Sequence, residues 1–109
     1  MSQKEETNIQ NRIRLELCKK GCLIFRCNTG NFFTKYGQEI KIGQVGHSDL
    51  YGIRDDGKAI FLEVKTKIGK ASEEQKKFIK AVKNKGALAG FAHSVDEALH
   101  IVFPENYKE

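Results

Sequence analysis

The sequence contains little proline, few cysteines and no long hydrophobic run. Its 109 residues include one proline and no stretch rich in proline or serine, so we expect no internal linker. No apolar run approaches the ~20 residues that a membrane-spanning helix needs. Because no repeat is present either, these absences predict one globular domain over residues 1–109.

The three cysteines, Cys18, Cys22 and Cys27, are an odd number and follow no charged-then-apolar signal segment. A disulfide framework is therefore not expected, and a reducing cytoplasmic setting fits better. A zinc site is the weaker alternative, because the spacings form no Cys-x-x-Cys pair and the histidines lie far away in the sequence.

Positive charge exceeds negative charge. Lysine plus arginine count 19 against 14 for aspartate plus glutamate, which gives a formal net charge of +5 and a pI of about 9.2. On so small a chain this balance fits a polyanionic partner such as nucleic acid, and it equally fits plain solubility.

Helix and strand patterns alternate along the first half of the chain. The capping box Thr7–Gln10 predicts a helix over 8–20, ended by Gly21, and residues 22–27 have strand character. Residues 28–47 are rich in glycine and aromatic residues. A short strand or a hairpin fits inside them. The segment as a whole fits an irregular connection packed by its own aromatic residues, and equally a flap that touches substrate or a second subunit.

In the second half of the chain, the pattern predicts strands at 48–53 and 58–66 and a helix at 73–85. A third strand at 87–92 and a short helix after Ser94 follow. The capping box Ser72–Gln75 begins the longer helix and Gly86 ends it, before the last strand, the short helix and a tail that we expect to fray. This order predicts an α/β or α+β sheet with helices on its faces.

Glu63 and Lys65 belong to the strand predicted over 58–66. Because side chains alternate across a strand, these two share one face, whereas Ile60, Leu62 and Val64 point toward a core. A carboxylate and an ammonium group on an inner strand are costly unless they are paired or used.

Asp49 belongs to the preceding strand, and the hairpin register decides whether it meets Glu63. A two-residue turn would set Asp49 opposite Val64, whereas a three-residue loop over 55–57 sets it opposite Glu63. Such loops place a left-handed residue near their end, where Gly57 stands. We therefore predict the three-residue loop or an equivalent bulge.

Two adjacent carboxylates raise each other's pKa unless a cation lies between them. Mg²⁺ or Mn²⁺ suits an all-oxygen site completed by water, a carbonyl and a substrate phosphate. This chemistry favours phosphodiester hydrolysis, in which Lys65 would orient or deprotonate the attacking water or stabilise the transition state. The alternative is a solvated hairpin face with cross-strand ion pairs.

Two helical residues are candidate supports for this site. Gln75 shares the apolar stripe of its helix and should face the sheet, although a capping box also favours glutamine there. Glu16 lies at the edge of the first helix's buried stripe, and it either reaches the site or stays solvated beside Arg12 and Lys20. The histidines are not spaced as a metal cluster, and we expect no catalytic role for His47.

The run Gly46–Leu50, followed by Glu63-Val64-Lys65 and then Gln75, resembles the PD-(D/E)XK nuclease superfamily. Within it, the sequence is similar to the VRR-NUC family, in its small stand-alone phage or bacterial form. The resemblance covers nearly the whole chain. It implies an α/β fold with a restriction-endonuclease-like core, in which helices flank a mixed central sheet.

The resemblance also implies roles for single residues. Asp49, Glu63 and the Val64 carbonyl would be metal ligands, and Lys65 would be the catalytic lysine. Glu16 would be the acidic residue of the first helix, and Gln75 the helix glutamine that supports the site. It implies a structure-selective endonuclease that uses Mg²⁺ or Mn²⁺ on four-way (Holliday) junctions or branched DNA. Such an enzyme would work as a homodimer inside a bacterium or a phage-infected host.

The Val-Arg-Arg tract that names the family is absent, because the last predicted strand runs Ala89-Gly90-Phe91-Ala92-His93. A basic contact of that tract is either missing or replaced by His93, which puts substrate preference in doubt more than the metal site. The main alternative is a non-catalytic DNA-binding module that retains the nuclease fold. A weaker one is an accessory protein whose basic surface meets an acidic partner.

Overall fold

The computed structural model describes residues 3–26, 30–33, 35–37, 39–42, 49–66 and 70–107. In chain order its elements are α1 (Gln3–Lys19), β1 (Leu23–Arg26), β2 (Gly30–Phe33), β3 (Glu39–Ile42), β4 (Leu50–Ile53), β5 (Ala59–Val64), α2 (Glu73–Asn84), β6 (Leu88–Ala92), α3 (Val95–Val102) and the short 3₁₀ helix η1 (Pro104–Tyr107). The predicted element order is therefore confirmed.

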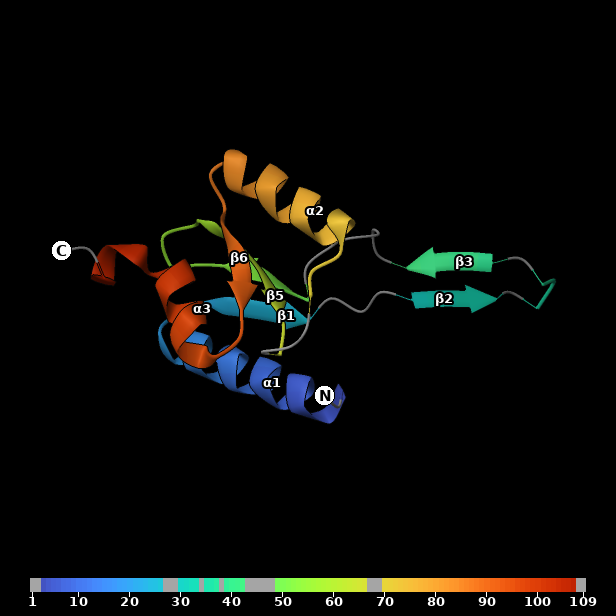
Figure 1. The fold of residues 1–109 in the computed structure, drawn as a ribbon, viewed down its shortest axis with the longest axis horizontal. Helices are drawn as coiled ribbons and strands as arrows, with labels where there is room; N and C mark the ends of the chain where they lie inside the picture. Colours follow the sequence, from blue (N-terminus) through green and yellow to red (C-terminus); the bar gives the residue numbers. More distant parts are fainter. Residues whose placement is uncertain are drawn as a thin grey trace.

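Four strands form a mixed sheet in the order β1-β4-β5-β6, with helices on both of its faces (Figure 1). The first three are antiparallel neighbours, whereas β5 and β6 run parallel and are connected through α2. The helices α1 and α3 pack against each other on one face, and α2 contacts β5 and β6 on the other. The α/β fold with a mixed sheet flanked by helices is confirmed.

The hydrophobic core lies between the sheet and the pair α1 and α3. It is built from aliphatic side chains of all these elements, including Ile13, Leu17, Leu50, Ile60, Leu62, Val64, Ala98 and Val102. The alternation predicted for β5 is observed, because its core-facing set is fully buried. The alternate side chains of β5 face α2, where the rings of Phe61 and Phe78 meet edge to face with centroids 5.6 Å apart.

The first helix begins earlier than the sequence pattern suggested. The prediction of a capping box at Thr7–Gln10 is wrong, because α1 already begins at Gln3 and Thr7 lies inside it. The preceding glutamine, lysine and glutamates favour helix, and Glu5 and Glu6 in the first turn interact well with the helix dipole. Gln10 is buried instead of capping the helix.

The strands β2 and β3 form a separate hairpin that extends away from the main sheet (Figure 1). Their backbone register runs from Gly30 opposite Ile42 to Phe33 opposite Glu39. The short hairpin expected inside residues 28–47 is confirmed. Its contact with substrate or a second subunit stays a prediction.

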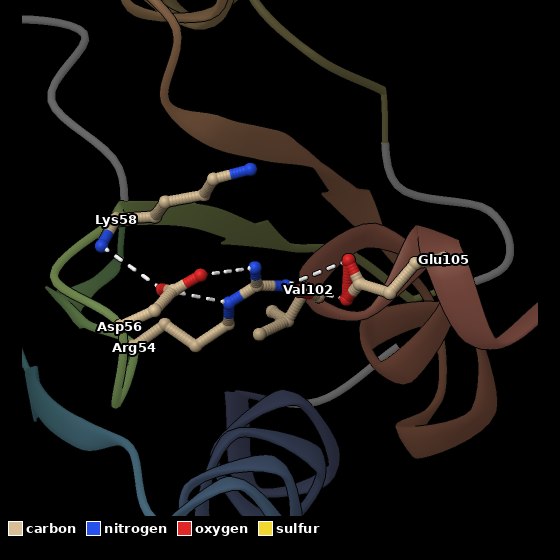
Figure 2. A network of polar contacts seen from close by, with 5 residues as sticks. All are labelled: Arg54, Asp56, Lys58, Val102 and Glu105. Atoms are coloured by element: carbon tan, nitrogen blue, oxygen red, sulfur yellow. Dashed lines mark hydrogen bonds and ion pairs between the residues drawn. The ribbon is translucent and has the colours of Figure 1, made fainter.

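The C-terminal segment was expected to fray, but it forms η1 and is held by Arg54 at the turn between β4 and β5 (Figure 2). The Arg54 guanidinium donates to the Val102 carbonyl at 2.8 Å and to Glu105 Oε1 at 2.6 Å. It also pairs with Asp56, whose pKa it lowers to about 2 by hydrogen bonding. A long-range ion pair therefore overrides the polar local sequence of the tail.

Replacing Gly52 by alanine should destabilise the fold, by about 3 kcal/mol, because a Cβ at this position would overlap the backbone carbonyl of Leu23 on the neighbouring strand. Gly90→Ala is the matched control, since its Cβ would meet only the end of the Ile101 side chain, which can move. Urea denaturation of both variants measures the difference. Equal losses of unfolding free energy in the two variants would contradict the close approach of β1 to β4.

Arg54→Met should lower the free energy of unfolding by about 2 kcal/mol, because Glu105 and the Val102 carbonyl lose a charged donor. Hydrogen exchange of the amides in 104–107 should also become faster. Lys19→Met removes an exposed ion pair and should cost less than about 0.5 kcal/mol. A loss for Arg54→Met no larger than for this control would show that the network does not hold the tail.

Candidate active site

The register of the β4–β5 hairpin places the two predicted acidic residues together. Leu50 lies opposite Leu62 at the last pair of the ladder, and Asp49 directly precedes β4. The Asp49 carboxylate accepts a hydrogen bond from the Val64 N–H at 2.9 Å and lies close enough to Glu63 to raise the pKa of that residue. The geometric condition for a two-carboxylate site is therefore met.

A three-residue loop produces this register. The Arg54 N–H donates to the Lys58 carbonyl and the Gly57 N–H donates to the Arg54 carbonyl, both at 2.8 Å. Gly57 has a φ of +91°, in the left-handed region that favours glycine. The predicted loop over 55–57, ending in a left-handed glycine, is confirmed.

The carboxylate of Glu63 is buried between the sheet and α2, with 1% of the side chain exposed. Its Oε1 accepts a hydrogen bond from Gln75 Nε2 at 2.9 Å and lies 3.8 Å from Lys65 Nζ. Its Oε2 is buried and has no hydrogen-bond donor among the residues that the structure describes. One oxygen is thus held by protein groups, and the other is left for a ligand.

Asp49 is oriented by the backbone of the opposite strand. Its Oδ2 accepts a hydrogen bond from the Val64 N–H at 2.9 Å. The N–H and the carbonyl of one strand residue point to the same edge, so the Val64 carbonyl faces the same side as Asp49. Oxygen atoms from three predicted ligand residues therefore lie near one end of β5.

The environment of Glu63 disfavours its charged form. Burial, followed by the nearby charge of Asp49, raises the pKa of Glu63 to about 8, and the attraction of Lys65 only partly opposes this. Without a cation, this environment therefore favours the protonated form of Glu63. A divalent cation between the two carboxylates would remove this penalty.

The donor set fits Mg²⁺ or Mn²⁺, which bind oxygen ligands. Within the described part of the chain, no group of three histidine, cysteine, aspartate or glutamate side chains is placed to hold a metal ion. A cation at Asp49 and Glu63 would therefore complete its coordination with a carbonyl, water and substrate oxygen, as the sequence predicted. Cys18 and Cys22 are free thiols.

Gln75 both caps α2 and faces the sheet, the two roles that its sequence position allowed. Its backbone N–H donates to Ser72 Oγ at 3.1 Å, and its side-chain Oε1 accepts from the Ser72 N–H at 2.9 Å. This capping box leaves the Nε2 of the same amide pointing at Glu63. The start of α2 and the position of Glu63 are thus coupled through one side chain.

Glu16 is not brought to this site. It belongs to α1, which covers the other face of the sheet, and its carboxylate pairs with Lys19 Nζ at 3.3 Å. The solvated alternative therefore describes it better. His47 lies outside the described residues. His93 follows β6, and its backbone N–H and its ring Nδ1 both lie 2.8 Å from Glu97 Oε1.

Two aromatic residues near the acidic pair were not expected from the sequence. Tyr51 belongs to β4 and follows Asp49, which directly precedes this strand, by two positions. Phe25 lies opposite Tyr51, and their ring centroids are 5.6 Å apart. The two-residue spacing between Asp49 and Tyr51 is visible in the sequence. The pairing of β4 with β1, which brings Phe25 beside Tyr51, is not.

The mixed sheet carries two neighbouring carboxylates and a lysine at one end, and a helix adds a glutamine to them. This arrangement fits a nuclease-like core. The VRR-NUC domain family model matches residues 4–96, and the chain belongs to this family. A solved structure described as "VRR_NUC domain" shares the fold, with a TM-score of 0.67 and 20% identity over 95% of this chain and 98% of that chain. A search of curated proteins finds no match.

Membership of the family gives the chain a nuclease-type function in DNA processing. The predicted family is therefore confirmed, together with its fold. Among the described residues, no helix has the length and apolar character required to cross a bilayer.

Without divalent cations, the free energy of unfolding should fall as pH rises from about 4.5 to about 8. The folded chain holds the Glu63 proton to higher pH than the unfolded chain, so it binds more protons in this window. Glu63→Gln has no proton to lose and should flatten the curve, whereas Glu16→Gln, at an exposed position, should not. Urea titrations in EDTA measure this. Equal slopes for wild type and Glu63→Gln would contradict the burial of an uncompensated carboxylate.

Proposed function

We propose that residues 1–109 form one nuclease domain that hydrolyses DNA phosphodiester bonds with Mg²⁺ or Mn²⁺. The single observation that carries this proposal is that the carboxylates of Asp49 and Glu63 lie next to each other at one end of β5, with a buried Glu63 oxygen that lacks a described donor. Asp49, Glu63 and the Val64 carbonyl would hold the cation. Bound there, it would supply Lewis-acid stabilisation of the phosphate and a lower pKa for a bound water.

The residues around the carboxylates prepare the site before substrate arrives. Gln75 holds one oxygen of Glu63 and the Val64 N–H holds one oxygen of Asp49, so neither carboxylate must reorient at the moment of reaction. Lys65 is the proposed catalytic lysine. As an ammonium ion, on the same face, it would orient the attacking water or balance charge on the phosphate, and only as a neutral amine would it accept the water's proton.

DNA as substrate is supported by the family and by the net charge of +5. Structure-selective cutting of four-way or other branched DNA is the finer proposal, based on the resemblance to small stand-alone members. Two symmetric cuts in such a substrate require two active sites, which a homodimer would provide.

Lys65→Ala and Asp49→Asn should each lower the cleavage rate at least about 100-fold while leaving the fold intact, because each removes a group that acts on the reacting phosphate or its cation. Labelled four-way, flap and linear DNA with Mg²⁺ or Mn²⁺ at low salt provide the assay. Lys76→Ala is the control, since Lys76 is exposed and pairs only weakly with Glu73 at 3.5 Å.

Cation binding is tested separately by thermal melting. Mg²⁺ or Mn²⁺ should raise the Tm of the wild type, because a ligand that binds the folded state stabilises it, and Asp49→Asn should lose this shift. Full activity in either catalytic variant would overturn the assigned roles. If the wild type bound DNA but cut none of the substrates with either metal, the non-catalytic DNA-binding alternative would replace the proposal.

A further inference from the structure

Among the elements that the structure describes, no helix packs on β1 and β4 at the sheet face that carries the carboxylates. The contacts of α2 are with β5 and β6, whereas four large side chains of β1 and β4 on the same face remain exposed. We call them the β1–β4 patch, which consists of Leu23 (61% exposed), Phe25 (49%), Tyr51 (38%) and Ile53 (43%).

The aromatic half of the β1–β4 patch lies next to the acidic pair. Tyr51 belongs to β4 and is two residues from Asp49, which directly precedes this strand, so the two lie about 7 Å apart along the chain. Phe25 lies across from Tyr51, with the two rings tilted by 33°. The aliphatic pair, Leu23 and Ile53, lies one step further from Asp49. A strand of DNA with a phosphate at the carboxylates that continues along β4 would therefore bring a neighbouring base near the rings.

The size of the patch favours a small occupant. Side chains of this size at these exposures present on the order of 400 Å². A standard protein interface buries about 800 Å² on each partner, so the β1–β4 patch by itself is too small for a stable dimer. A single nucleobase, with its flat π face, is of the right size and chemistry for two aromatic rings.

Charge favours the same occupant. The chain carries a net charge of +5, which attracts the DNA backbone without regard to sequence. Stacking of one base on an aromatic side chain contributes about 1–3 kcal/mol and tolerates any base. Bases inside a duplex are already stacked, whereas bases at a flap, gap or branch point are available at low cost.

We propose that Phe25 and Tyr51 bind an unstacked nucleobase beside the bond to be cut, so that the domain selects DNA with unpaired nucleotides at that position. This inference rests on the proposed function, because it takes Asp49 and Glu63 as the place of cleavage. It assigns the selection of DNA structure to two rings on the sheet, apart from the residues that act on the phosphate.

The test measures binding of the full chain in EDTA, so that no DNA is cut. The probes are a flap DNA with 2-aminopurine at an unpaired nucleotide next to the branch, and a fully paired duplex of the same sequence. Wild type should quench the flap probe and not the duplex probe. The double variant Phe25→Leu/Tyr51→Leu keeps apolar volume but no rings. It should lose the quenching and bind flap DNA about tenfold more weakly.

The same double variant should bind duplex DNA within twofold of wild type and keep the same salt dependence, because phosphate contacts are unchanged. Tyr107→Leu is the matched control. Tyr107 is a comparably exposed aromatic residue that stacks on His100, and its loss should leave both probes unaffected. Melting curves verify that the variants remain folded.

Three results would overturn the inference: equal loss of affinity for flap and duplex, absence of selective quenching by wild type, or a wild-type dimer that dissociates in the double variant. The last would show that a second copy covers the β1–β4 patch. Selective quenching without metal-dependent cutting would refute only the nuclease proposal. Cutting without selective quenching would refute only this inference.

Discussion

The pairing of β4 with β5 is the constraint on which the rest of the structure depends. Side chains alternate with a period of two, so a slip of one residue would turn Asp49 to the opposite face from Glu63. The three-residue loop with its left-handed Gly57 prevents this slip at the turn. The fully buried Leu50 and Leu62 prevent it along the strands, because either would be exposed in another register.

The strand β5 serves two purposes through its two faces. One face supplies three fully buried aliphatic side chains to the core, and this packing holds the strand rigidly. The other face carries Glu63, with Lys65 directly after the strand, and there burial and a second carboxylate make the apo site costly. A well-packed core therefore offsets an electrostatic penalty that a cation would relieve. Active sites are often less stable than the fold around them would allow, because function requires such an arrangement.

Local signals in the sequence were sufficient for most of the fold and for the centre of the candidate site. A capping box predicted the start of α2, and hairpin chemistry predicted the register that joins Asp49 and Glu63. Gln75 was predicted to face the sheet, and it does so while it also caps its helix. The failures have non-local causes. Glu16 was placed by helical spacing alone, which does not say which face of the sheet a helix covers.

By itself, the sequence determined the elements, the register of one hairpin and the family, because these follow from spacings of a few residues and from turn chemistry. Only the tertiary structure decided which helix covers which face, that Arg54 would hold the chain's last helix through Val102 and Glu105, and that Phe25 would lie beside Tyr51. Contacts between residues about 25 or 50 positions apart depend on how the layers pack. A local pattern does not contain that information.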